Sequence, residues 1–315
     1  MVSIYVDQKY YFREVVNQGI VATIGFFDGV HCGHRFLIEQ LKHTAGRSGL
    51  PAAVITFPLH PRKVMQSDYQ PELLNSFDEK LYQLSTTGVD YCFIMDFTLA
   101  LSELTAEVFM KEKLRNEFHV KKLLVGYDHQ FGRGRIAGFE DYKEYGARCG
   151  IEVLRVKQLT EGDLHFSSTT IRKLLATGKM REAAKILTYD YSLSGVVVRG
   201  DEVGRTIGFP TANLKVAEPL KVIPSSGVYA SRCYVNNACY GSMTYIGSRP
   251  TLATGGALRI ETHLFDFSGD LYDKDLKIEF IDFLRPNIRF DSIDALKRQL
   301  YKDRDAALGY ALQSQ

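Results

Sequence analysis

Short, continuous apolar runs alternate with helix-like segments through the first part of the chain. Runs of this kind predict strands buried on both faces, here over 20–27, 52–57, 91–95, 122–126 and 151–154. Segments with apolar residues at helical spacing separate them, over 36–41, 79–84, 106–117 and 139–149. Strands that alternate with helices are typical of βαβ units. We therefore predict an α/β domain with a doubly wound parallel sheet.

Beyond about Leu187 the apolar period changes to two, with turn residues between the runs. The dipeptide Asn236-Asn237 predicts a tight hairpin turn, and a last apolar stripe from Ile293 to Leu308 predicts one closing helix. This spacing is typical of a small barrel or sandwich, and we predict a small antiparallel β-barrel with a closing helix. The predicted domains are 1–187 and 188–315. The predicted strands cover 193–198, 228–235, 238–246, 259–267 and 276–283.

The composition is that of an ordinary globular protein. Of its 315 residues, 45% are hydrophobic and 24% are charged, and the formal net charge is +2. A nucleic-acid partner usually requires a basic stripe or a strongly basic domain, so we expect none. The sequence carries no signal for an oligomeric state.

Cysteine usage and the N-terminal residues indicate a cytoplasmic protein. The five cysteines are scattered and form no C-x-x-C pair, which argues against a disulfide framework and against a zinc site. The N-terminus has neither a basic leader nor an apolar stretch, so we expect no signal peptide. Because no apolar run approaches the roughly 18 residues of a membrane helix, we also expect no membrane partner.

The segment 25–34 follows the first long apolar run and contains the first candidate site. Gly29 and Gly33 allow a ligand to approach the backbone closely. His31 and His34 stand three residues apart at a predicted helix start, where free N–H groups and the helix dipole attract anions. The pattern favours stabilisation of a phosphoryl group under attack. The alternatives are a plain turn with two incidental histidines, or zinc, which lacks a third ligand nearby.

Further segments of the same half fit a nucleotide site: 56–61, 126–134 and 167–172. In the last of these, Arg172 puts a cation into a first helical turn, where the helix dipole disfavours it unless a phosphate is bound. The glycines at 132, 134 and 138 miss the dinucleotide fingerprint by one residue, so we exclude NAD binding. The sequence also contains no P-loop motif.

A second candidate site lies in the glycine-rich string 195–213. Thr211 and Asn213 follow a proline and alternate onto one face of an extended segment, where they offer oxygen atoms to a hard cation such as Mg²⁺. Downstream, Glu261 and His263 share one face of a predicted strand. A carboxylate there could take the proton from an alcohol that attacks the γ-phosphate of ATP. The alternative is a solvated strand face, which periodicity alone favours.

The motifs 27–34, 167–172 and 195–213 together resemble the bacterial bifunctional riboflavin kinase/FMN adenylyltransferases, also called FAD synthetases. The resemblance covers essentially the whole chain. It implies an N-terminal nucleotidyltransferase domain and a C-terminal kinase barrel, with ATP, Mg²⁺ and the flavins riboflavin, FMN and FAD as ligands. Riboflavin would be phosphorylated to FMN, and FMN would then be adenylylated to FAD.

The resemblance also implies roles for individual residues. His31 and His34 would contact the ATP phosphates, and Glu261 would be the general base of the kinase. Thr211 and Asn213 would hold the metal ion. In the N-terminal domain the expected ATP- and FMN-binding residues are Gly25, Phe27, Asp28, Gly29, Gly33, His60, Asp128, Phe131, Ser168, Thr169 and Arg172. In the C-terminal domain the expected ATP- and riboflavin-binding residues are Gly200, Gly204, Arg205, Gly208, Pro210, Thr211, Asn213 and Tyr229.

Three alternatives stay open at this point. Only one of the two activities could be retained, or the chain could be a flavin-binding regulatory protein with degenerate sites. A tRNA-charging enzyme shares the H-x-G-H turn, but the near-neutral charge disfavours it. Three positions depart from the family pattern. His129 stands where many relatives have Phe, which affects a packing contact in the first site, and Tyr245 stands where Asn is common, which affects a polar contact in the kinase site. Thr170 replaces a frequent Arg or Lys.

Overall fold

The computed structural model describes residues 1–5, 17–127, 129–156, 159, 166–200, 203–248 and 258–311. The chain divides into two compact units, Met1–Ser168 and Thr169–Gln315, and each is treated separately below. In the part of the chain that is described, no helix combines the length and the apolar character needed to span a bilayer.

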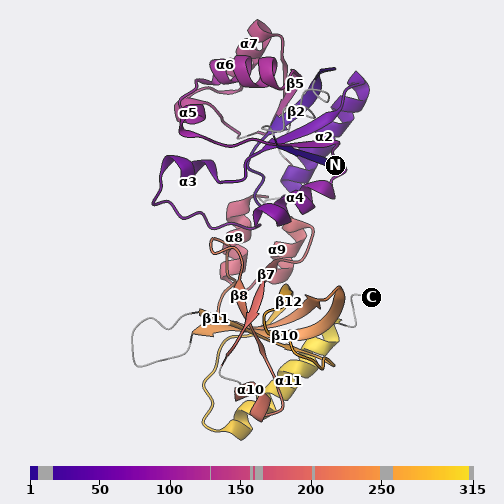
Figure 1. Ribbon diagram of the computed structural model, residues 1–315, viewed down its shortest axis with the longest axis vertical. Coiled ribbons are helices and arrows are strands. Elements are labelled where there is room, and N and C mark those ends of the chain that lie inside the picture. Colours follow the sequence, from indigo (N-terminus) through magenta and orange to yellow (C-terminus); the bar gives the residue numbers. More distant parts are fainter. Residues whose placement is uncertain are drawn as a thin grey trace. The chain divides into compact units, whose positions relative to one another are not determined.

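The N-terminal unit is an open parallel sheet with helices on both faces (Figure 1). Its strands are β1 (Val2–Tyr5), β2 (Ile20–Ile24), β3 (Ala52–Thr56), β4 (Tyr91–Ile94), β5 (Val120–Val125) and β6 (Glu152–Arg155). Its helices are α2 (Cys32–Ser48), α3 (Pro61–Met65), α4 (Phe77–Ser85), α5 (Leu99–Ser102), α6 (Ala106–Val108), the π-helix η1 (Phe109–Glu117), the 3₁₀ turn η2 (Arg133–Arg135) and α7 (Phe139–Cys149).

The sheet has the order β1-β4-β3-β2-β5-β6, and every adjacent pair is parallel. Its central strand β2 is buried along its whole length, with Ile20 and Ala22 packed in one core and Val21 in the other. Helices α2 and α4 contribute to the core that contains Val21, and η1 and α7 to the opposite one. The doubly wound parallel sheet is thereby confirmed. The edge strand β1 was not predicted.

The strand order reverses direction between β2 and β5. From β2 the chain proceeds to β3 on one side, whereas β5 pairs with the other side of β2 through Val21↔Lys122. Loops at the carboxyl ends of two such strands diverge and leave a crevice, which is where ligands bind in open α/β sheets. The turn that carries His31 and the loop that carries His129 leave the sheet at this point.

The C-terminal unit is an antiparallel β-barrel, as predicted (Figure 1). The barrel is closed, with the strand order β10-β11-β8-β7-β12-β9. Its strands are β7 (Ser192–Val198), β8 (Ala212–Val216), β9 (Gly227–Val235), β10 (Ala238–Ser248), β11 (Leu258–Leu264) and β12 (Asp275–Arg285). Its helices are α8 (Ser168–Ala176, of which Ser168 belongs to the N-terminal unit), α9 (Met180–Leu187), α10 (Val203–Thr206) and α11 (Ile293–Ala311).

Two sequence predictions for the barrel are confirmed in detail. Asn236 and Asn237 join β9 to β10 with φ values of 49° and 63°, the left-handed pair that a tight hairpin turn requires. The closing helix α11 packs against β9, β10 and β12. Helices α8 and α9 group with the barrel by their contacts, since Ser225 donates its N–H to the Leu175 carbonyl (3.1 Å). The functional boundary after residue 187 stays a prediction.

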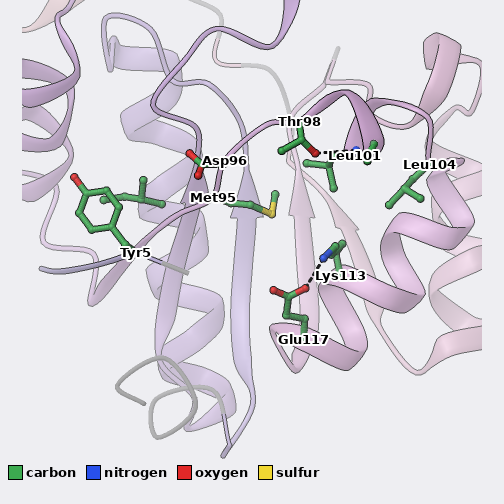
Figure 2. Close-up of a pocket in the computed structure, with 10 residues that line it drawn as sticks. Tyr5, Met95, Asp96, Thr98, Leu101, Leu104, Lys113 and Glu117 are labelled. Carbon is green, nitrogen blue, oxygen red and sulfur yellow. Dashed lines mark hydrogen bonds and ion pairs between the residues drawn. The ribbon is translucent and has the colours of Figure 1, made fainter. Parts of the chain in front are cut away.

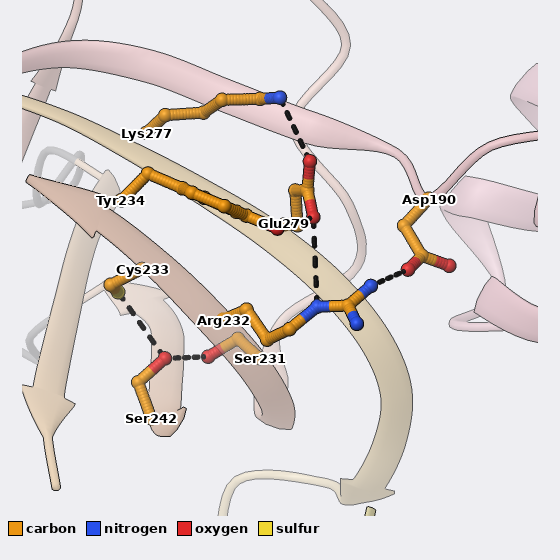
Figure 3. Close-up of polar contacts among 8 residues, drawn as sticks. All are labelled: Asp190, Ser231, Arg232, Cys233, Tyr234, Ser242, Lys277 and Glu279. Atoms are coloured by element: carbon orange, nitrogen blue, oxygen red, sulfur yellow. Dashed lines mark hydrogen bonds and ion pairs between the residues drawn. The ribbon is translucent and has the colours of Figure 1, made fainter. Parts of the chain in front are cut away.

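Hydroxyl and thiol groups line part of the barrel interior and bond to one another (Figure 3). Ser231 Oγ lies 2.8 Å from Ser242 Oγ and 2.7 Å from Thr244 Oγ1, and Thr244 donates to Thr262 at 2.9 Å. Cys233 donates to Ser242 at 3.2 Å. These buried groups satisfy each other, so they bind neighbouring strands together without leaving an unpaired polar atom among them.

The junction of β12 with α11 depends on a buried ion pair. Arg285 donates to both carboxylate oxygens of Asp303, at 2.9 Å from Nε and 2.7 Å from a terminal nitrogen, and Asp303 is only 3% exposed. We expect Asp303→Ala to lower the free energy of unfolding by about 3–5 kcal/mol, because Arg285 would lose its carboxylate. Hydrogen exchange of the β12 amides measures this change.

The matched control is Asp305→Ala. Asp305 pairs with Arg304 on the same helix at 2.9 Å, but its side chain is 65% exposed. An exposed pair contributes about 0–1 kcal/mol, so this variant should stay near the wild type. Equal losses in the two variants would contradict a special role for the buried pair.

Candidate active sites

The turn between β2 and α2 has an unusual backbone. Phe27 and Val30 adopt φ values of 56° and 37°, and Gly29 has a φ of 83°. The left-handed region is costly for a β-branched residue such as Val30, so surrounding contacts must impose it. Gly25 donates its N–H to Ile55 on β3 at 3.0 Å, and Val30 donates to the Phe27 carbonyl at 3.2 Å. The result is a compact turn that starts α2 directly beyond the sheet.

Helix α2 begins without a side-chain cap. Its N-cap residue is His31, whose side chain makes no hydrogen bond to the first turn, and the first helical bond runs from Arg35 N to His31 O at 2.9 Å. A Cβ atom added at Gly33 would lie 3.2 Å from the His31 ring. The positive end of a 17-residue helix therefore lies at the turn after β2 without a side-chain cap, where it favours an anion.

The two predicted histidines are brought together. The rings of His31 and His34 stack with their centroids 3.8 Å apart and their planes at 22°. Both Nδ1 atoms are buried without a hydrogen-bond partner, and so is Nε2 of His129 from the loop after β5. Buried polar atoms are nearly always hydrogen-bonded, so three unpartnered imidazole nitrogens in one region indicate a place for a ligand.

Burial keeps these imidazoles neutral. Desolvation lowers the pKa of His31 to about 4 and, with a smaller effect of Arg135, lowers the pKa of His129 to about 4. Burial also lowers the pKa of His34 well below its usual value, and repulsion from His31 and His129 adds to this effect. A neutral imidazole still donates one N–H group, and a phosphate oxygen is a strong acceptor for it.

Asp28 and Ser168 shape the turn. Asp28 is 6% exposed, and its Oδ1 accepts the backbone N–H groups of Leu74 (2.9 Å) and Asn75 (3.3 Å). Ser168 donates its hydroxyl to the Asp28 carbonyl at 2.9 Å. These bonds give both residues a structural role in the turn, and their predicted contact with a ligand stays a prediction.

Two other predicted binding residues have clear structural partners. His60 caps α3 by accepting the Arg62 N–H at 3.2 Å, and its ring packs edge-on against Phe26. Phe131 stacks on Tyr142 with centroids 4.2 Å apart, and the Tyr142 hydroxyl bonds both its N–H and its carbonyl. Their contacts with ATP or FMN stay predictions.

Three predicted residues are not placed at the N-terminal site. Asp128 lies outside the described residues. Thr169 and Arg172 lie on α8 within the C-terminal unit, so the geometry of the N-terminal unit does not include them. Their binding roles stay predictions.

Lys80 is a buried lysine near the turn that the sequence did not single out. Its side chain is 2% exposed, its Nζ donates to the Phe57 carbonyl at 2.7 Å, and the ammonium group lies 3.9 Å from the centre of the Phe26 ring. Burial lowers its pKa to about 8, against a smaller opposing effect of Asp28. The only sequence signal was its position four residues before Leu84, on the apolar face of α4.

A cavity of about 510 Å³ lies beside β4, and its lining includes none of the three histidines (Figure 2). Its wall includes the ion pair between Lys113 and Glu117 (2.7 Å). None of its lining residues was predicted as a site residue, and they are Tyr5, Ile94, Met95, Asp96, Thr98, Ala100, Leu101, Leu104, Lys113 and Glu117.

The second site lies on the outer face of the barrel. The Thr211 hydroxyl donates to Glu261 Oε2 at 3.2 Å, and Asn213 is the direct cross-strand partner of Glu261 between β8 and β11. All three side chains are half-buried. The structure therefore brings together the oxygen atoms that the sequence singled out. His263 binds the same segment from β11, with its Nδ1 2.8 Å from the Pro210 carbonyl.

The glycines of this site pack closely against the metal-ligand candidates. A Cβ atom added at Gly200 would lie 2.2 Å from Asn213 Nδ2, so a larger residue would displace that amide. Gly204 and Arg205 lie on α10, and Gly208 follows it. The predicted contacts of these residues and of the exposed Pro210 with ATP or riboflavin stay predictions.

Tyr229 lies inside the barrel, whereas Tyr245 lies beside Glu261. Tyr229 is fully buried, and its hydroxyl donates to the Ser225 carbonyl, so it supports the barrel wall. Its predicted ligand contact stays a prediction. Tyr245 lies directly opposite Glu261 in the pairing of β10 with β11. Cross-strand partners face the same side, so Tyr245 belongs to the surroundings of Glu261, and its departure from the family pattern falls within the predicted kinase site.

Charged side chains on β9 and β12 form polar contacts with one another and with Asp190, which precedes β7 (Figure 3). Arg232 pairs with Asp190 and lies 3.6 Å from Glu279, and Glu279 accepts from Lys277 at 2.8 Å and from Tyr234 at 2.8 Å. Burial is the main cause that raises the pKa of Asp190, against the opposing charge of Arg232. Each charge has a partner, which is typical of a structural network.

Comparison with known proteins gives a consistent result for both units. The family described as FAD synthetase matches residues 13–170, and the family described as riboflavin kinase matches residues 187–311. The bifunctional riboflavin kinase/FMN adenylyltransferase of Listeria monocytogenes is 36% identical over 304 residues, 96% of each chain. The Escherichia coli K12 protein of the same description is 37% identical over 287 residues, 91% of each chain.

A solved structure of a protein from Streptococcus pneumoniae, described as a macrolide-efflux protein, has the same fold. It matches with a TM-score of 0.85 and 29% identity over 98% of this chain and 99% of its own. Its title names a role that neither family match indicates. The fold and the two sites thus define a nucleotidyltransferase-type α/β unit followed by a kinase barrel. The chain belongs to the bifunctional riboflavin kinase/FMN adenylyltransferase family.

The buried histidines predict acid sensitivity of the N-terminal unit. The unfolded chain takes up protons at its histidines below pH 6.5, whereas folded His31 and His129 stay neutral down to about pH 4. The free energy of unfolding should therefore fall as the pH decreases from 6.5 to about 4, on the order of 3 kcal/mol for each residue. Hydrogen exchange of the β2 amides at several pH values measures it.

His31→Ala should reduce this pH dependence. His43→Ala is the control, because His43 lies exposed on the same helix. An unchanged pH dependence in the His31 variant would show that its burial does not contribute.

Proposed function

We propose that the chain converts riboflavin to FMN in its C-terminal unit and FMN to FAD in its N-terminal unit, with one ATP consumed in each step. The observation that carries the proposal is the group of three buried, unpartnered imidazole nitrogens next to the uncapped N-terminus of α2. Neutral donors and a helix dipole in a desolvated place suit a polyphosphate. Membership of the family supports both activities.

In the N-terminal unit a phosphate oxygen of FMN attacks the α-phosphorus of ATP. A new P–O bond forms, the bond to the β-phosphate breaks, and pyrophosphate leaves. His31 and His34 donate N–H groups to the oxygens on which charge develops, and they act strongly because their surroundings exclude water. The backbone at Gly29 and Gly33 allows close approach, so positioning and charge stabilisation account for the rate and no covalent intermediate is needed.

In the C-terminal unit Glu261 acts as the general base. Its carboxylate takes the proton from the ribityl 5′-hydroxyl of riboflavin, whose oxygen attacks the γ-phosphorus of ATP, and ADP leaves. The Thr211 hydroxyl, which donates to Glu261 at 3.2 Å, orients the carboxylate in the free protein. Half-burial of Glu261 limits its contact with water while leaving it accessible to an alcohol.

The same residues fit Mg²⁺. Thr211, Asn213 and Glu261 present a hydroxyl, an amide and a carboxylate on adjacent strands, and such oxygen donors are the ligands that Mg²⁺ prefers. Thr211 and Asn213 would hold the ion. Bound Mg²⁺ supplies positive charge that neutralises the phosphate oxygens during transfer.

The proposed partners are small molecules, namely riboflavin, FMN and ATP. All five cysteines are free thiols, and the barrel thiol Cys233 is buried, which fits a protein of the reducing cytoplasm. We therefore propose a cytoplasmic location.

Chromatography of flavins tests the two activities together. The purified chain is incubated with riboflavin, ATP and Mg²⁺, and FMN and FAD are measured over time. FMN followed by FAD supports both sites. FMN alone would mean that only the kinase activity is retained, and no conversion would favour a flavin-binding regulatory protein.

Glu261→Gln separates the kinase from the second reaction. We expect FMN formation to fall about 10²–10⁴-fold, because the amide cannot accept the proton, while FMN supplied externally is still converted to FAD. Initial rates with each flavin measure this. Loss of both reactions would contradict the assignment of Glu261 to the kinase alone.

The double variant His31→Ala with His34→Ala should have the converse effect. We expect FAD formation to fall at least about 10²-fold, because two donors to the transferred group are lost, with phosphorylation of riboflavin unchanged. His43→Ala, on the exposed face of α2, is the control. Normal FAD accumulation in the double variant would exclude these histidines from the site.

A further inference from the structure

His129 is the member of the imidazole cluster to which the proposed function gives no role. It follows β5, and its backbone N–H donates to the Gly126 carbonyl at 3.3 Å. A Cβ atom built at Gly126 would lie 3.8 Å from the His129 Cβ and 3.9 Å from Cδ2 of Leu37 on α2. The side chain of His129 therefore begins where the carboxyl end of β5 meets α2.

The ring of His129 lies near the Phe131 ring, and one of its nitrogens has no hydrogen-bond partner. The ring lies 6.1 Å from that of Phe131, which is itself stacked on the buried Tyr142. The side chain is partly exposed as a whole, whereas its Nε2 is buried and makes no hydrogen bond. A ring that served packing alone would not need a polar atom turned into a desolvated place, where leaving it unpaired costs free energy.

The electrostatic surroundings of His129 favour an anion. It lies close enough to His34 on α2 for repulsion between the two rings to lower the pKa of His34. After burial, the one further influence on the pKa of His129 among the described residues is the positive charge of Arg135, which lowers it. An imidazole under the influence of a guanidinium charge, and close to a histidine in the first turn of α2, lies in a positive field that would favour a phosphate chain.

We propose that His129 is a third phosphate-binding imidazole of the adenylyl-transfer site, donating from Nε2 to the triphosphate chain of the bound nucleotide. This inference rests on the proposed function of the N-terminal unit. His31 and His34 reach the ligand from the start of α2, and His129 reaches it from the end of β5, on the other side of the strand-order reversal. The three donors would then hold the phosphate chain from two elements, which restricts its orientation for in-line attack.

Two substitutions at His129 distinguish hydrogen bonding from packing. His129→Phe keeps a ring of similar shape and removes the donor, whereas the side-chain amide of His129→Gln can place a nitrogen near the position of Nε2. His43→Gln, on the exposed face of α2, is the matched control. All variants are full-length chains, and their riboflavin kinase activity and unfolding temperature are measured in parallel.

The measurements are the steady-state rate of FAD formation with varied ATP and with varied FMN, and inhibition of that rate by pyrophosphate. For His129→Phe we expect kcat/KM for ATP to fall about 10- to 100-fold and pyrophosphate inhibition to weaken, as expected for one lost bond to a charged group. His129→Gln should recover most of this loss, and His43→Gln should behave as the wild type.

The remaining outcomes would overturn the inference. Unchanged kcat/KM for ATP in His129→Phe would mean that His129 only packs. An equal loss of kcat/KM in the Phe and Gln variants, together with a lowered unfolding temperature, would also mean that His129 only packs. A change confined to KM for FMN would mean that His129 contacts FMN and not ATP. If the wild type formed no FAD at all, the proposed function of the N-terminal unit would fail. That result would not depend on the His129 variants, so the two failures can be distinguished.

Discussion

Complete burial of β2 determines where the N-terminal site can form. Because all five residues of this strand are buried and both of its edges are paired, the chain can leave it only at the carboxyl end of the sheet. There the backbone must turn sharply, and Phe27 and Val30 accept left-handed conformations to do so. The turn starts α2 with its amide groups toward the strand-order reversal. The placement of His31 and His34 depends on this geometry.

The two sites are prepared for ligands in opposite ways. In the N-terminal site, imidazole nitrogens are buried without partners, so a phosphate bound there as proposed would gain hydrogen bonds without breaking existing ones. In the C-terminal site, Thr211 and Glu261 are already bonded to each other, so ligands must replace an existing interaction. The unpartnered nitrogens of the N-terminal site raise the free energy of the free protein. In the C-terminal site, the hydrogen bond from Thr211 keeps the Glu261 carboxylate oriented. Both use rigid strands to fix the distances.

Much of this architecture could be predicted because its determinants are local. Fully apolar runs identified β2 and β3, and the dipeptide Asn236-Asn237 identified its hairpin. The three-residue spacing of His31 and His34 indicated that their rings lie on one side of the helix start, and the rings do lie together. Long-range features could not be predicted. Burial of Lys80 depends on the carbonyl of Phe57, and the contact of Thr211 with Glu261 spans 50 residues and needs the register of β8 with β11. The short, half-exposed β1 lacked a clear pattern.

The closed barrel also bears on self-association. Closure pairs every strand of the C-terminal unit, so none offers an open row of backbone groups to a second molecule. The parallel sheet does have edges, β1 and β6, and both are only four residues long. Glu152 on β6 is also paired with Lys122 on β5 at 2.8 Å. Short edges discourage intermolecular pairing of the folded chain, so association through this sheet should be confined to refolding, before its helices have covered the two faces.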